Sequence, residues 1–224
     1  MSDKWMVLGS SPSAPSYFQI PDVDFIASAG AAILLCRPDW YLIFERNALW
    51  LHADELKDAR ANGTKVAVYG EWRKFIKDTK GEDYEYPCDE WLDDFCKGSA
   101  FRSHLYWTPG HYAQSVGGCL ALQWAVNHGA KEVHIVGLEG YSGEVDYFTG
   151  ERGTYIGPRL TREGYGPLMQ KIVSLSPEIQ FVVYGDLKYP LDGDNVSLFQ
   201  GESNSALTLS RGSISTKGVC NELA

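Results

Sequence analysis

The chain has 224 residues, of which 44% are hydrophobic and 13% aromatic, and its formal net charge at pH 7 is −9. This length and apolar content suit one folded domain with a well-buried core and exclude a chain that is disordered throughout. The acidic balance argues against broad, non-specific binding to nucleic acid, although a single nucleotide phosphate needs only one or two local donors.

Signals for membrane insertion, secretion and metal binding are missing from the sequence. No stretch approaches the ~20 apolar residues of a membrane span, and the first residues lack the apolar region of a signal peptide. The five cysteines have no C-x-x-C spacing, which favours free thiols in a reducing compartment, and the five histidines are not spaced as metal ligands. We expect a cytoplasmic protein with no transmembrane segment and no metal site, and the sequence is compatible with a homo-oligomer.

The first half of the chain alternates apolar runs with helical signals. His52–Asn62 fits a helix that Gly63 ends. Residues 70–112 are rich in aromatic and acidic side chains without a clear period, so we expect irregular structure with short helices, forming a cap that faces the substrate. Strand-like apolar runs cover Met6–Gly9, Asp24–Ala27, Trp40–Phe44 and Thr64–Tyr69.

The second half continues the alternation and ends in a different composition. We expect a helix over Ser115–His128, a strand over Lys131–Gly137 and a long loop over Glu139–Leu160. A helix over Gly166–Leu175, with Pro167 in its first turn, and a strand over Gln180–Tyr184 follow. From Leu198 the chain is rich in Ser, Gly and Asn, which predicts a mobile tail.

Nearly continuous apolar strands between helices are typical of a parallel sheet that is covered on both faces. The sequence therefore predicts a single α/β domain over residues 1–197, with a doubly wound, Rossmann-like, mostly parallel sheet, an irregular cap and a long loop. Residues 198–224 form the predicted tail.

The first strand runs into a turn of small residues that is a candidate phosphate site. The turn exposes backbone N–H groups and hydroxyls, which suit an anion. An ordinary strand-to-helix turn with a capping serine is the alternative, because neither a Walker A loop nor a G-x-G-x-x-G motif is present. The candidate ligand-binding residues here are Gly9, Ser10, Ser11 and Ser13.

A second small-residue segment opens the helix that we expect from Ser115. Gly117 and Gly118 would let a ligand approach the backbone and its free amide donors, or would instead relieve crowding where the helix packs on the sheet. Ser115 completes this candidate loop. His111 lies just before it and is the one histidine that we consider as a general base.

The segment after the strand Lys131–Gly137 carries candidate catalytic groups. Glu139 could accept hydrogen bonds from ribose hydroxyls or activate an acceptor, and Tyr141 and Tyr147 could steady a leaving phosphate. In the following loop, Arg152 and Arg159 are candidate phosphate clamps. The alternatives are exposed tyrosines and a solvated charged loop.

Together these segments resemble the bacterial lipo-oligosaccharide sialyltransferases, which use a CMP-activated sugar, and, more widely, the archaeal-type hydroxymethylpterin diphosphokinases. The family motifs are G-N-G-P-S after the first strand, T-S-G before a helix, G-Y-K-E, G-I-D-F-Y and Y-I-G. The similar segments of this chain are Gly9-Ser10-Ser11-Pro12-Ser13, Val116-Gly117-Gly118, Gly129-Ala130-Lys131-Glu132, Gly137-Leu138-Glu139-Gly140-Tyr141 and Tyr155-Ile156-Gly157.

The resemblance implies a nucleotide that lies along Ser10, Gly117 and Gly118, with its phosphate at Tyr141 and Tyr147. Pro158 stands where that family has a histidine that is its proposed catalytic base, so this chain lacks the family's base at that position.

The resulting expectation is a nucleotide-binding transferase, most simply a glycosyltransferase-like enzyme that uses a nucleotide-activated sugar and needs no metal. Glu139, His111 and Asp146 remain alternatives for the group that activates the acceptor. A second hypothesis is an ATP-dependent pyrophosphokinase, with Mg²⁺ held by Glu139, Glu144 and Asp146. A third is a non-catalytic nucleotide-binding protein that kept the fold and lost the reaction.

Overall fold

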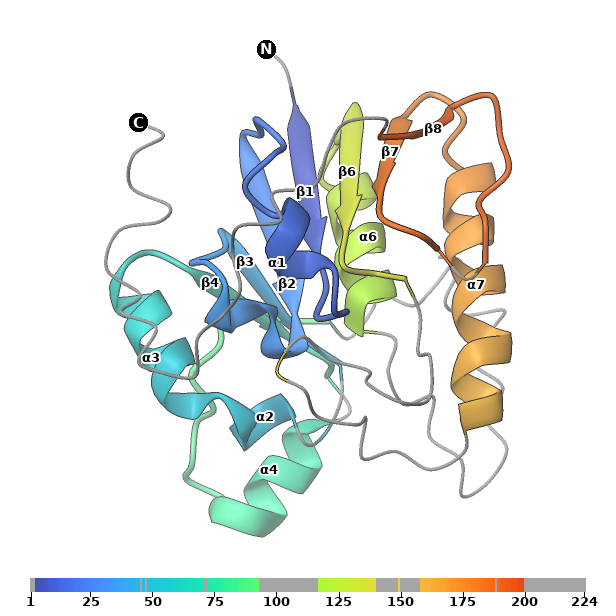
Figure 1. Ribbon diagram of the computed structural model, residues 1–224. Helices are drawn as coiled ribbons and strands as arrows, with labels where there is room; N and C mark the ends of the chain where they lie inside the picture. The colour runs from blue at the N-terminus through green and yellow to red at the C-terminus, as the bar shows by residue number, and fades with distance from the viewer. Residues whose placement is uncertain are drawn as a thin grey trace.

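A parallel sheet forms the centre of the protein. The computed structural model describes residues 3–44, 46, 48–70, 72–92, 117–139, 149, 158–187 and 189–199, without the side chains of residues 158–165. The eight strands of this part follow the order β5-β4-β3-β2-β1-β6-β7-β8, and each neighbouring pair is parallel (Figure 1). The strands are β1 Lys4–Leu8, β2 Phe25–Ala29, β3 Trp40–Ile43, β4 Lys65–Val68, β5 Glu90–Trp91, β6 Glu132–Val136, β7 Gln180–Tyr184 and β8 Val196–Leu198.

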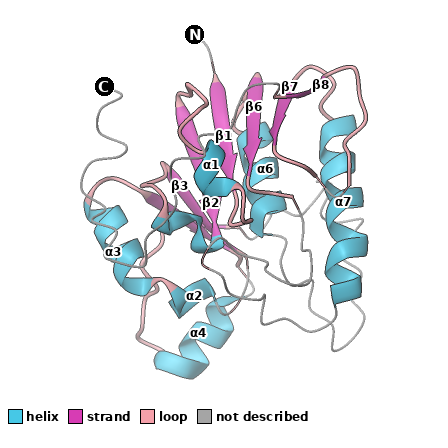
Figure 2. Ribbon diagram, in the orientation of Figure 1, coloured by secondary structure: helices cyan, strands magenta, loops and turns pink. Residues whose placement is uncertain are grey.

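Helices lie on both faces of the sheet, which confirms the predicted doubly wound α/β architecture (Figure 2). The helical elements are α1 Ala14–Tyr17, the 3₁₀ helix η1 Gly30–Leu34, α2 Ala48–Leu51, α3 Ala53–Ala61, α4 Trp72–Lys80, α6 Gly117–Asn127 and α7 Pro158–Ser174. The helices α6 and α7 cover one face of the sheet, and their side chains, among them Trp124 and Ile172, pack against it. The other face is covered by α1, η1 and α3.

Helix α6 is apolar around most of its circumference because it lies against the middle of the sheet. Every residue from Cys119 to Ala125 is buried, and the helix contacts β1, β2, β3 and β6. Gly129, with a φ of 81°, follows the end of the helix, and the Ala130 N–H bonds back to the Ala125 carbonyl at 3.2 Å.

Helix α7 corrects one expectation from the sequence. It begins at Pro158 rather than Gly166, so Pro167 lies inside the helix and not in its first turn. An interior proline removes one helical hydrogen bond, but the residues that follow it, including Leu168 and Ile172, are buried in the core. Gly166 has a packing role, since a Cβ there would lie 2.4 Å from the Cβ of Tyr189.

The segment expected to be irregular with short helices contains such a helix, and also a strand that was not predicted. The helix α4 and the two-residue strand β5 both lie within residues 70–112, and β8 was not predicted. Among the residues that the structure describes, no helix is long and apolar enough to cross a membrane. The division of the chain at residue 197 stays a prediction, because residues 200–224 lie outside the described part.

Candidate active site at the carboxyl edge of the sheet

The strand order places a switch point between β1 and β6. From β1 the chain builds the sheet outward through β2 to β5, then returns to the other side of β1 and continues through β6 to β8. Ligands of open α/β sheets bind past the carboxyl ends of the strands at such a point. The loop Gly9–Ser13 and the segment Gly137–Glu139 leave the sheet there, side by side.

These two segments are joined by backbone contacts. The Gly9 N–H donates to the Val136 carbonyl at 2.8 Å, and the Ser11 N–H donates to the Gly137 carbonyl at 3.0 Å. A Cβ at Gly9 would lie 2.2 Å from the Gly137 oxygen, and Gly137 itself has a φ of 68°. The close approach of the two strand ends thus accounts for both glycines without a ligand.

One group of predicted site residues gathers at the end of β2. The Ser10 hydroxyl donates to the Ala29 carbonyl at 3.3 Å, and a Cβ at Gly30 would lie 3.0 Å from the same hydroxyl oxygen. A Cβ at Gly117 would lie 3.1 Å from that of Ala29. Ser10 and the start of α6 as the structure describes it therefore flank the end of β2, at the carboxyl edge of the sheet.

A second group gathers on the other side of β1, where β6 and β7 end. The ideal Cβ position at Gly185, which has a φ of 82°, lies 2.9 Å from Glu139 Oε1 and 3.1 Å from Ser13 Oγ. Neither oxygen has a hydrogen-bond partner among the described residues, and both atoms are buried. The site thus has two halves. One lies beside the end of β2 and contains Ser10 and the start of α6; the other lies where β6 and β7 end and contains Ser13 and Glu139.

The electrostatics of Glu139 are unusual for a carboxyl group. Burial raises its pKa from the ordinary value of 4.5 to about 7; a backbone hydrogen bond from Ser13 acts in the opposite direction, and the nearby charge of Asp186 raises the pKa further. Near neutral pH this side chain can therefore either hold or release a proton.

The remaining predicted site residues are not placed by the structure. Arg159 lies in the first turn of α7, whose start is on the same side of the sheet as the strand ends (Figure 1), but its side chain is outside the described residues. The other candidate residues, which all lie outside the described part, are His111, Ser115, Tyr141, Glu144, Asp146, Tyr147 and Arg152. Gly118, by contrast, is placed at the start of α6.

Two site residues escaped the sequence analysis, although the sequence carries a signal for them. Gly185 and Asp186 directly follow the predicted strand Gln180–Tyr184, just as Gly9 and Gly137 follow β1 and β6. A glycine after a buried parallel strand is the pattern that all three share.

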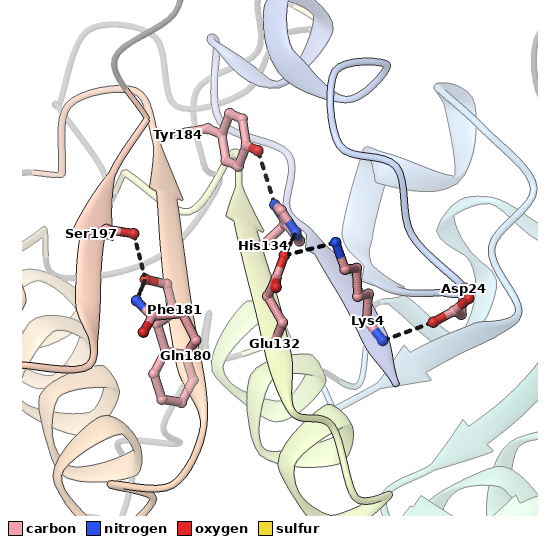
Figure 3. A network of polar contacts seen from close by, with 8 residues as sticks. All are labelled: Lys4, Asp24, Glu132, His134, Gln180, Phe181, Tyr184 and Ser197. Atoms are coloured by element: carbon pink, nitrogen blue, oxygen red, sulfur yellow. Dashed lines mark hydrogen bonds and ion pairs between the residues drawn. The ribbon is translucent and has the colours of Figure 1, made fainter. Parts of the chain in front are cut away.

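A polar network runs along the sheet from Lys4 and Glu132 at the starts of β1 and β6 to Tyr184 at the end of β7 (Figure 3). The buried His134 ring bonds the Tyr184 hydroxyl through Nδ1 at 2.9 Å and the Glu132 carboxylate through Nε2 at 2.7 Å. Lys4 Nζ lies 3.5 Å from Glu132, and the Lys4 backbone N–H donates to Asp24. Burial lowers the pKa of His134. These contacts give His134 a structural role within the sheet.

No group of three or more His, Cys, Asp or Glu side chains is arranged for a metal ion within the described ranges. Cys88 is a free thiol.

Comparisons with known proteins identify the fold. No protein-family model matches the chain, and no curated protein sequence matches it significantly. Among solved structures, the sialyltransferase CstII from Campylobacter jejuni, in complex with the substrate analogue CMP-3FNeuAc, aligns with a TM-score of 0.53 and 13% identity over 80% of this chain and 81% of that one. The monofunctional alpha-2,3-sialyltransferase Cst-I from Campylobacter jejuni aligns with a TM-score of 0.54 and 10% identity over 94% and 90%. The chain therefore shares its fold with these sialyltransferases, which it resembles distantly.

Proposed function

We propose that this protein is a nucleotide-binding transferase of the glycosyltransferase type, which takes its sugar from a nucleotide-activated donor. The observation that carries the proposal is the convergence at one switch point of the Gly9–Ser13 loop, the Gly137–Glu139 segment and the start of α6. The fold shared with two sialyltransferases, one of them solved with a CMP-sugar analogue, supports the choice of donor.

The donor phosphate would lie at the half of the site beside β2. In this proposal the phosphate takes its hydrogen bonds from backbone N–H groups at the start of α6, where Gly117 and Gly118 carry no side chain that would hold an anion away. In the reaction, an acceptor oxygen bonds to the anomeric carbon, the bond from that carbon to the phosphate oxygen breaks, and the nucleotide leaves with the electron pair. We assign Tyr141, Tyr147, Arg152 and Arg159 to stabilising that leaving phosphate.

The test is a thermal-shift screen of the full chain with CMP, UDP, GDP, ATP and the sugar conjugates of the first three. We expect one nucleotide and its sugar conjugate to raise the melting temperature, and the conjugate to be hydrolysed slowly when no acceptor is present. Both effects should persist in EDTA, because this scheme uses no metal.

Other outcomes of the screen would reject the proposal in different ways. ATP turnover that stops in EDTA would indicate the pyrophosphokinase reaction instead. A shift with a nucleotide but no hydrolysis of any conjugate would indicate a binding protein. No shift with any compound would reject nucleotide binding altogether.

A further inference from the structure

Glu139 and Ser13 reach the same place from two different strand ends. Glu139 follows β6 and Ser13 closes the loop after β1, while Gly185 continues from β7 between them. The positive φ of Gly185 would strain any other residue, and a Cβ there would lie tightly against the two oxygens. The fold therefore keeps this position without a side chain directly beside a carboxylate.

The carboxylate has no ionic partner in the part of the chain that the structure describes. Its Oε1 and the neighbouring Ser13 Oγ are buried without hydrogen-bond partners there, although buried polar atoms in folded proteins are nearly always paired. A bound water, an ion or a catalytic role accounts for such an atom. The Glu139 side chain as a whole is only partly buried, so the group is not sealed in the core.

The groups around Glu139 influence the pKa of its carboxyl group. Asp186 from the end of β7 is exposed and repels a second negative charge, whereas the Ser13 backbone N–H favours the ionised form. The Tyr17 ring from α1 lies 3.5 Å from the ideal Cβ position at Gly185. A carboxylate held in a salt bridge would stay ionised and would be a weak base. Glu139 instead has a pKa of about 7, which suits proton transfer at neutral pH.

We propose that Glu139 is the catalytic base that takes the proton from the acceptor hydroxyl. The inference rests on the proposed function and chooses among the three groups that the sequence left open. As the acceptor oxygen bonds to the anomeric carbon and the nucleotide phosphate departs with its electron pair, the acceptor proton passes to a Glu139 carboxylate oxygen. After product release, Glu139 returns that proton to water, so no other reactant is needed.

The experiment measures donor hydrolysis, in which water is the acceptor, from pH 5 to 9 with the full chain. The probes are CMP-sialic acid and, in parallel, UDP- and GDP-sugars. The wild-type kcat should fall below an apparent pKa near 7, because the base must be ionised. Glu139→Gln should lower kcat by roughly 10²–10⁴-fold, leave KM within about threefold, and abolish this pH dependence.

Three further variants control for folding and for charge. Glu139→Asp keeps a carboxylate on a shorter stem, so it should be slow yet retain the fall in rate at low pH. Asp186→Asn removes the neighbouring charge and should move the apparent pKa downward. Glu132→Gln makes the same change at the other end of β6 and should keep the wild-type pH profile.

The possible failures are distinguishable. If wild-type protein hydrolyses none of the donors, the proposed function fails and this inference fails with it. If Glu139→Gln hydrolyses the donor at the wild-type rate, or is slow but keeps the wild-type pH profile, Glu139 is not the base and the proposed function stands.

Discussion

The backbone N–H of Ser11 donates to the carbonyl of Gly137 at 3.0 Å, and this contact couples the end of β1 to the end of β6. The two residues are far apart in sequence, yet their strands are neighbours in the sheet. The contact fixes the direction in which both segments leave the sheet. Ser10 is thereby placed toward the end of β2, and Ser13 toward the end of β7.

The first prediction concerns the tight packing at this junction. Gly9→Ala places a methyl group 2.2 Å from the Gly137 oxygen and should lower the free energy of unfolding by about 1–3 kcal/mol, as over-packed cores do. Urea unfolding followed by circular dichroism measures the change. Gly117→Ala is the matched control: its closest neighbour, the Ala29 Cβ, is 3.1 Å away, so its cost should be below about 1 kcal/mol. Equal losses in the two variants would refute the packing explanation.

The second prediction concerns the phosphate half of the site. Gly117→Asp adds a negative charge at the start of α6 and should weaken binding of the nucleotide found in the screen by roughly tenfold or more, through charge repulsion. The helix should not unfold, because an acidic residue is favourable in a first helical turn. Titration calorimetry provides the measurement.

A charge-matched variant separates a local effect from a change in net charge. Gln180→Glu adds the same charge at the exposed start of β7, at the opposite edge of the sheet, and should bind the nucleotide as the wild type does. If both variants lose affinity equally, the phosphate does not lie at α6.

The central strands could be predicted because each is an apolar run long enough to be recognised, as in Lys131–Gly137 and Gln180–Tyr184. The strands that were missed, β5 and β8, have two and three residues and lie at the edges of the sheet, where half of the side chains or more are exposed. The start of α7 was missed because Gly166 and Pro167 interrupt its pattern, and only burial against α6 and the sheet compensates for them.

For the site, the sequence predicted that Ser10, Ser13 and Glu139 follow strands, and the parallel sheet brings those strand ends to one edge. The separation of Ser10 from Ser13 and Glu139 could not be predicted, since it depends on which strands flank β1. The burial of the Glu139 carboxylate could not be predicted either, because it depends on Gly185, which comes from a distant segment of the chain.

The third prediction is a loss of stability in acid that His134 causes. Burial lowers its pKa below the unfolded value of 6.5, so the unfolded chain takes up a proton before the folded one does. This contribution to stability is present above pH 6.5 and is lost as the pH falls through the folded-state pKa.

The contribution can be isolated by substitution. In His134→Gln the acid-dependent loss should shrink, which melting curves between pH 8 and pH 5 would show. The groups that face the ring are Glu132, Tyr184 and Lys4, and each is kept in this variant. An unchanged difference between the melting temperatures at pH 8 and pH 5 would contradict the assignment.

The fourth prediction has the opposite sign and tests Glu139 without any ligand. Its pKa is raised from 4.5 to about 7, so the folded state holds a proton that the unfolded state has already released. The stability that this provides is complete below pH 4.5 and is lost as the pH rises through 7.

The variant Glu139→Gln cannot ionise at this position. Relative to the wild type, it should therefore gain stability as the pH rises from 5 to 8, by on the order of 1–3 kcal/mol given the partial exposure of the side chain. Denaturant unfolding of both proteins at the two pH values measures this difference, with Glu178→Gln, at an exposed position, as the control for the substitution itself. A constant difference between Glu139→Gln and wild type at pH 5 and pH 8 would show that Glu139 ionises as an ordinary surface acid, and it would remove the electrostatic basis for its role as the base.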